Sequence, residues 1–120
     1  MRNAVVLTVL AAVAGAVLLV HGGSAASGPT YNANVAPILD AKCASCHRLG
    51  GIAPFALTTA ADAKAHAAGI VRMTKAGLMP PWMPGDDSAA IVGRDVRRLT
   101  NTELATLAQW AAAGAPAGNA

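Results

Sequence analysis

The sequence predicts an all-α domain that is too small to be stable through its own core alone. Apolar residues recur at helical spacing in three stretches, residues 35–43, 63–74 and 104–111, and only residues 91–92 suggest a short extended piece. The 94 residues from position 27 onward contain 47 apolar residues, of which 23 are alanine. A chain with so little apolar surface usually carries a disulfide, a metal or a large apolar cofactor.

Residues 1–26 have the pattern of a secretory signal peptide. Arg2 precedes an uncharged, mainly apolar run over residues 4–20, and the segment ends in the small residues 24–26. These features are typical of an export signal, and we expect cleavage after Ala26. The alternative is an uncleaved membrane anchor, because the run lies between the usual lengths of a signal and a span. The sequence thus predicts one periplasmic domain over residues 27–120, tethered to the inner membrane only if the signal remains.

The first predicted helix runs into the first cysteine. Apolar residues at helical spacing extend from Val35 to Leu39 and lead to Cys43. Asn32 or Asn34 is expected to cap this helix.

The second predicted helix lies in the middle of the domain. Thr58 or Thr59 is expected to cap it, Asp62 falls in its first turn, and Gly77 is expected to end it. The residues expected on its inner face are Ala63, Ala67, Ile70, Val71 and Thr74.

The last predicted helix has the clearest signals. Thr100 and Glu103 form a capping box, and Gly114 is expected to end the helix. Its apolar face is expected to contain Leu104, Leu107, Ala108, Trp110 and Ala111. Residues 116–120 are expected to be a frayed tail.

The two cysteines stand in a C-x-x-C-H motif, with Cys43, Cys46 and His47. Three interpretations compete. A redox dithiol needs a βαβ setting that the sequence lacks, and a structural zinc needs four ligands, for which only His47 and His66 remain. The third is covalent haem c, for which this motif is the attachment signature. Residues three and four apart share a helical face, so two thioethers and one imidazole meet the same group. Haem is therefore the expected cofactor, and it also supplies the missing apolar bulk.

The order of these elements resembles class I cytochrome c. The likeness covers most of residues 34–118: a helix ending in C-x-x-C-H, a proline-bearing loop, a middle helix, a Met-Pro and an aromatic-bearing last helix. G-I-A-P-F at 51–55, M-P-P-W at 79–82, R-L-T at 98–100 and W-x-x-x-G-A-P at 110–116 are similar to small bacterial periplasmic cytochrome modules. The resemblance implies three main helices and loops around one covalently attached haem. It also implies contact between the first and last helices, with Val35, Ile38 and Leu39 against Leu107 and Trp110.

The resemblance also implies neighbours for the haem. In the family a proline carbonyl accepts the second ring N–H of the proximal histidine, and Pro54 is the matching position; the alternative is that Pro54 only shapes the loop. The propionates need donors if they are partly buried. The candidates by loop position are Trp82, Arg94, Arg97 and Arg98, although each arginine could equally be a solvated surface charge.

Four residues after the motif are candidates for the sixth ligand of the iron. Met79 is favoured because it precedes a proline, as in the family, and Met83 in the same proline-stiffened loop is second. His66 and Met73 lie on the middle helix, where packing roles are expected.

Coordination by His47 and Met79 would make the chain an electron carrier and not an enzyme, because an iron with both axial positions filled cannot bind substrate. Its partners would be periplasmic or membrane redox proteins. An open sixth position would instead suit a small peroxidase or a gas sensor, and a non-haem structural or zinc-binding module is the third class. The chain after residue 26 carries a net charge of only +2 and has no basic stripe, which argues against nucleic acid.

Overall fold

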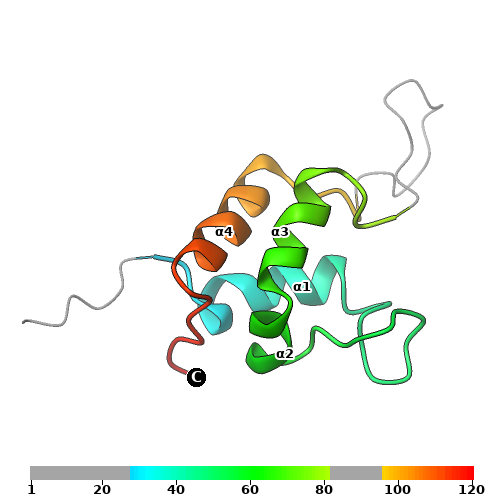
Figure 1. The fold of residues 1–120 in the computed structure, drawn as a ribbon, viewed down its shortest axis with the longest axis horizontal. Helices are drawn as coiled ribbons and strands as arrows, with labels where there is room; N and C mark the ends of the chain where they lie inside the picture. The colour runs from blue at the N-terminus through cyan, green and yellow to red at the C-terminus, as the bar shows by residue number, and fades with distance from the viewer. Residues whose placement is uncertain (1–27, 82–95) are drawn as a thin grey trace, which may run out of the picture.

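The computed structural model describes residues 28–81 and 96–120, and across these two ranges the chain forms helices and loops with no strand. The elements in chain order are a π turn η1 (Tyr31–Val35) and the helices α1 (Ala36–Lys42), α2 (Ala60–Ala65), α3 (Ala67–Lys75) and α4 (Asn101–Ala112) (Figure 1). The predicted all-α class is confirmed for these residues. The predicted signal at 1–26 and the predicted extended piece at 91–92 lie outside them.

The first helix begins earlier than the sequence suggested. Its N-cap is Thr30, whose hydroxyl oxygen accepts a hydrogen bond from the backbone N–H of Ala33 at 3.4 Å. Asn34 is not the cap. It lies in the first turn, and its Oδ1 accepts a hydrogen bond from the backbone N–H of the cap residue Thr30 at 3.0 Å. The expected cap at Asn32 or Asn34 is therefore wrong, since this reciprocal pair places the cap two residues before Asn32.

The middle helix is broken into two. Thr59 caps α2 as predicted, with its side chain accepting from the Asp62 N–H at 3.1 Å. His66 then leaves the helical path, with φ −109° and ψ 8°, before α3 resumes. Gly77 follows the end of α3 as expected, and its φ of +69° lies in the left-handed region. The predicted inner face is confirmed for four residues, Ala63, Ala67, Ile70 and Thr74, whereas Val71 is only half-buried.

The capping box of α4 is present. Glu103 donates its N–H to the Thr100 hydroxyl at 3.1 Å and accepts the Thr100 N–H at 2.7 Å. Gly114 and Ala115 then take positive φ values of 85° and 54° and turn the chain back.

The C-terminal tail is not frayed. The Pro116 carbonyl accepts hydrogen bonds from the Tyr31 N–H at 2.9 Å and from the Trp110 indole N–H at 3.0 Å. The Ala117 carbonyl accepts from the Asn32 N–H at 3.0 Å. The first N–H groups of a helix have no partner within it. Here the tail supplies those partners, which is why it is ordered.

The core lies between the first helix, α3 and α4. Four large side chains are fully buried in one cluster, namely Val35, Leu39, Leu107 and Trp110. The expected contact between the first and last helices is thus present, since η1 packs against α4, and Figure 1 shows α4 lying beside α3 with α1 passing behind α3. Within the described residues no helix has both the length and the apolarity to cross a membrane.

Candidate functional site

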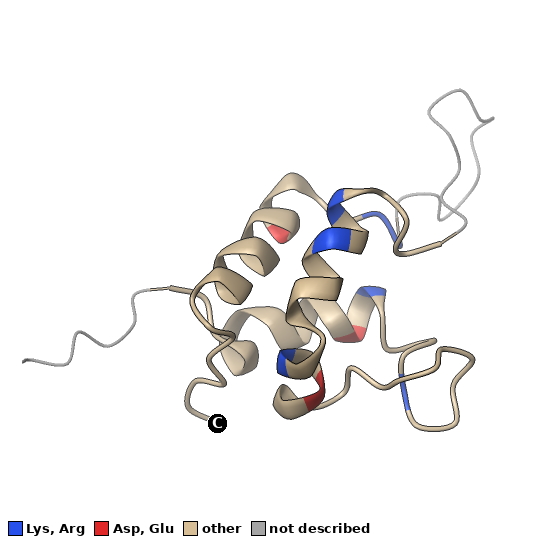
Figure 2. Cartoon of the chain, in the orientation of Figure 1, with Lys and Arg blue, Asp and Glu red and all other residues tan. Residues whose placement is uncertain are grey.

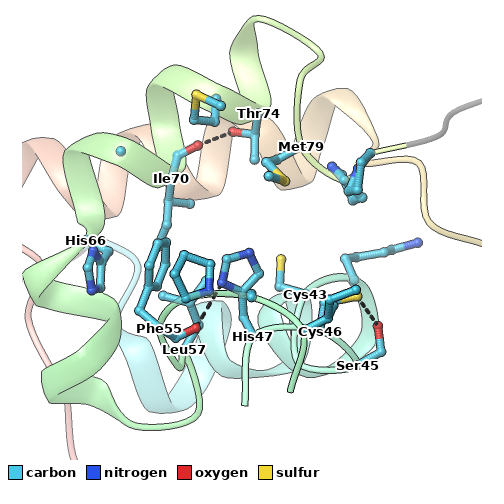
Figure 3. A pocket seen from close by; sticks show the side chains of 18 of the residues that line it. Cys43, Ser45, Cys46, His47, Phe55, Leu57, His66, Ile70, Thr74 and Met79 are labelled. Atoms are coloured by element: carbon cyan, nitrogen blue, oxygen red, sulfur yellow. Dashed lines mark hydrogen bonds between the residues drawn. The ribbon is translucent and has the colours of Figure 1, made fainter. Parts of the chain in front are cut away.

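A mostly apolar cavity of about 470 Å³ opens between the end of α1, the loop after it, α3 and the segment after Gly77 (Figure 3). Its volume lies in the range of cofactor and ligand sites. The residues that line it are Lys42, Cys43, Ser45, Cys46, His47, Ile52, Ala53, Pro54, Phe55, Leu57, His66, Gly69, Ile70, Arg72, Met73, Thr74, Met79, Pro80, Pro81 and Arg97. None of these described residues is acidic, and three are cationic. The cavity therefore suits an apolar body that carries negative charge.

The C-x-x-C-H motif forms a single turn after α1. The Cys43 carbonyl accepts from both the Cys46 N–H at 3.1 Å and the His47 N–H at 2.9 Å. This turn continues the helical path past Lys42, so all three functional side chains line the same cavity. The sequence predicted this convergence.

The cysteines are free thiols in partly buried positions. Burial, with a smaller contribution from Cys46, raises the pKa of the Cys43 thiol to about 11. Reactive cysteines of redox motifs have lowered pKa values, because their thiolates are stabilised by nearby positive charge or a helix N-terminus. Cys43 follows the C-terminal end of a helix instead. Its surroundings therefore disfavour a redox thiolate.

A zinc site also lacks ligands in this part of the chain. In the ranges that the structure describes, no group of three or more His, Cys, Asp and Glu side chains is placed to hold a metal ion. A structural zinc needs four ligands.

The His47 ring is held by the loop that follows it. Its Nδ1 lies 3.1 Å from the carbonyl oxygen of Phe55. The resemblance implied the carbonyl of Pro54, so the acceptor is one residue later than expected. Two backbone hydrogen bonds set this register: the Ala53 N–H donates to the Cys46 carbonyl at 3.2 Å, and the Leu57 N–H donates to the His47 carbonyl at 2.9 Å.

Met79 lies across the cavity from His47 (Figure 3). The chain turns at Gly77, and the N–H groups of Leu78 and Met79 both donate to the Met73 carbonyl, at 3.0 and 3.2 Å. This turn folds the segment back over the cavity and fixes the start of the methionine side chain. Met83, the second candidate for the sixth ligand, lies outside the described residues.

His66 and Met73 also line the cavity. The His66 ring stacks on Phe55, with centroids 3.8 Å apart and planes 15° from parallel. The Phe55 ring in turn lies 4.7 Å from the His47 ring, at 45°. Phe55 thus lies between the two histidines.

The expected propionate donors are only partly placed. Arg97 lines the cavity, Arg98 is half-buried and does not line it, and Trp82 and Arg94 lie outside the described residues. Sequence reasoning missed two cations of the lining, Lys42 and Arg72. The position of Lys42 directly before the motif was a signal for the first, whereas nothing in the sequence pointed to the second.

Comparisons with known proteins return no match: no protein-family model, curated protein or solved structure is similar to this chain. The site itself consists of two thiols and an imidazole on one wall, a thioether on the opposite wall, and an apolar interior between them.

Proposed function

We propose that the chain is a monohaem c-type cytochrome that carries single electrons between redox partners in the periplasm. The observation that carries this proposal is the convergence of Cys43, Cys46 and His47 on one wall of an apolar cavity, with Met79 on the other. A cytochrome c-like fold belongs to the same proposal.

The residues present fit a covalently attached haem. Cys43 and Cys46 are both free thiols, and each would add across one vinyl group so that its sulfur bonds one carbon and its hydrogen ends on the other. The apolar lining accepts the porphyrin, and the absence of carboxylates from the described lining leaves room for two propionates. Bound haem would supply a one-electron couple between ferric and ferrous iron.

His47 is prepared to be the proximal ligand. A carbonyl oxygen only accepts, so Nδ1 must carry the proton that it donates to Phe55. Nε2 is then left with its lone pair for the iron. The same hydrogen bond orients the ring and raises its basicity.

Met79 favours a carrier over a haem enzyme. A thioether in the sixth position leaves the iron no free site for peroxide or a gas, so only electrons are exchanged. A peroxidase would also need a distal base, and His66, the remaining histidine of the lining, is stacked on Phe55. No second function is favoured by a specific observation.

The decisive experiment uses the exported protein made with a haem-attachment system. We expect a mass equal to that of the chain plus one haem, starting at Ser27 if the signal is cleaved and at Met1 if it is an anchor. The pyridine haemochrome spectrum should show a haem with both vinyl groups saturated, and the ferrous protein should resist carbon monoxide. Rapid carbon monoxide binding would favour the enzyme or sensor, and a haem-free, stably folded product would contradict the proposal altogether.

A further inference from the structure

The cavity has two distinct ends, and His66 marks one of them. Figure 3 shows Cys43 and Cys46 together at one end and His66 at the other, with His47 and Phe55 between them. His66 is the residue at which the middle helix breaks between α2 and α3. The break places this half-buried imidazole at the entrance to α3 and directs it to the cavity.

Two of the three lining cations lie at the cysteine end instead. Lys42 directly precedes Cys43, and its Nζ donates to the Val96 carbonyl at 2.7 Å. This bond brings the neighbouring Arg97 to the same end. Arg72 lies on α3 six residues beyond His66, which is about 9 Å along the helix. Among the polar side chains labelled in Figure 3, His66 lies farthest from the cysteines.

The structure of haem indicates which of its groups would lie at the His66 end of the cavity. The vinyl groups and the propionates of haem lie on opposite edges of the porphyrin. If the vinyl edge is bonded to Cys43 and Cys46, the propionate edge points away from them, toward His66. A partly buried carboxylate needs a hydrogen-bond donor. Gly69, one turn after His66, leaves open space there, because a Cβ built on it meets nothing within 4 Å.

We propose that His66 donates a ring N–H to a haem propionate, an inference that rests on the proposed function. Its ring is free for this, since no hydrogen bond joins it to any other described residue. The stack on Phe55, with centroids 3.8 Å apart, fixes the ring plane from one side. His66 is then a positioning residue of the haem and a determinant of its reduction potential. Arg97, one of the four candidates by loop position, follows Val96, whose carbonyl is bound by Lys42 at the cysteine end of the cavity.

The consequence is electrostatic. A propionate carboxylate near the iron stabilises the ferric state, which carries the larger positive charge, and a donated hydrogen bond weakens that influence. Loss of the donor should shift the equilibrium toward ferric iron by roughly threefold to tenfold, a fraction of the effect of one hydrogen bond to a charged group.

The test compares four variants of the haem-loaded protein by potentiometric titration and by the propionate bending band in resonance Raman spectra. His66→Phe keeps the stack and removes the donor, whereas His66→Gln keeps a donor. Lys64→Gln removes an exposed positive charge two residues away and is the control for net charge. Phe55→Leu removes the stacking partner while leaving the backbone carbonyl in place.

We expect His66→Phe to lower the potential and shift the propionate band, His66→Gln to change both less, and Lys64→Gln to change neither. The potential and the propionate band of Phe55→Leu should lie between those of the wild type and those of His66→Phe. This variant keeps the inference testable if His66→Phe does not accumulate. Wild-type potential and wild-type propionate band in His66→Phe would overturn the inference while leaving a covalent-haem carrier intact. A bis-histidine spectrum in the wild-type protein that His66→Phe abolishes would also overturn it, by making His66 an axial ligand. Failure of the wild-type chain to bind haem would instead refute the proposed function.

Discussion

The Nδ1 atom of His47 lies 3.1 Å from the carbonyl oxygen of Phe55, eight residues further along the chain. This contact links the proposed proximal ligand to a loop that is closed by backbone hydrogen bonds to Cys46 and His47. Because the acceptor is a backbone atom, the contact depends on the path of the loop and not on the identity of the side chain.

Gly51 controls that path, and Gly51→Ala should disturb the ligand. A Cβ at this position would collide with the Cys46 carbonyl and meet the Arg48 carbonyl at 3.0 Å, neither of which is a flexible side-chain end. We expect a loss of roughly 1–3 kcal/mol of stability, as for overpacked sites, measured by thermal unfolding. The weakened His47–Phe55 bond should make the imidazole less basic and raise the reduction potential.

Gly50→Ala is the matched control for that substitution. Gly50 has a positive φ of 72° but open space around its Cβ position, so the cost is backbone strain of about 1–2 kcal/mol without a collision. Its potential should stay at the wild-type value. Equal potentials in both variants would show that the loop does not tune the ligand.

Met79→Ala should convert the carrier into a haem protein with an open site. The potential should fall, because a thioether favours ferrous iron, and carbon monoxide or cyanide should bind quickly. Met73→Ala, in the same lining, is the matched control, and Met83→Ala and His66→Ala should likewise leave the visible spectrum nearly unchanged. Retention of a low-spin, methionine-like ferric spectrum by Met79→Ala would transfer the role to Met83.

Cys46→Ala should prevent folding of the exported chain. The described core contains only four large side chains that are fully buried, and the neighbouring cavity is large and apolar. Without attached haem this surface stays in water, and the apolar area buried is too small to offset chain entropy. Circular dichroism and periplasmic abundance measure the outcome, and a cooperative melting transition of the haem-free chain would contradict it.

Tyr31 should make the protein sensitive to alkali. Burial, followed by the charges of Asp40 and Asp62, raises the pKa of its phenol above 10.0. The folded state thus holds this proton more tightly than the unfolded state, so stability is constant below about pH 10 and falls as pH rises toward the folded-state pKa. Tyr31 is the chain's one tyrosine, so tyrosinate absorbance reports it directly. Tyr31→Phe should remove this decline in melting temperature; an unchanged decline would assign it to another group.

Electron transfer to partners should depend only mildly on salt. A net charge of +2 after residue 26, offset by two propionates, leaves a weak long-range field. Figure 2 nevertheless shows cations near the end of α3 and the segment that leads into α4. Second-order rates at low and moderate ionic strength decide the matter: a steep fall that Arg97→Gln reduces and Lys64→Gln does not would show that a local patch dominates.

The sequence by itself determined the features that depend on one or two turns of chain. Thr59 caps α2, Thr100 and Glu103 close the capping box of α4, and Gly77 ends α3. The C-x-x-C-H spacing likewise predicted that three reactive side chains face one way. Such features need only neighbours within about four residues, so the local pattern predicts them.

Only the tertiary structure decided the features in which distant segments meet. The acceptor for His47 is Phe55 and not Pro54, because long-range packing and two backbone hydrogen bonds set the register of the loop. The tail after Pro116 is ordered because it satisfies the open N–H groups at Tyr31 and Asn32, more than eighty residues away. The Val96 carbonyl next to Arg97 accepts a hydrogen bond from the Lys42 side chain, 54 residues earlier in the chain. No periodicity encodes these contacts, since each depends on where two separately folded stretches come together.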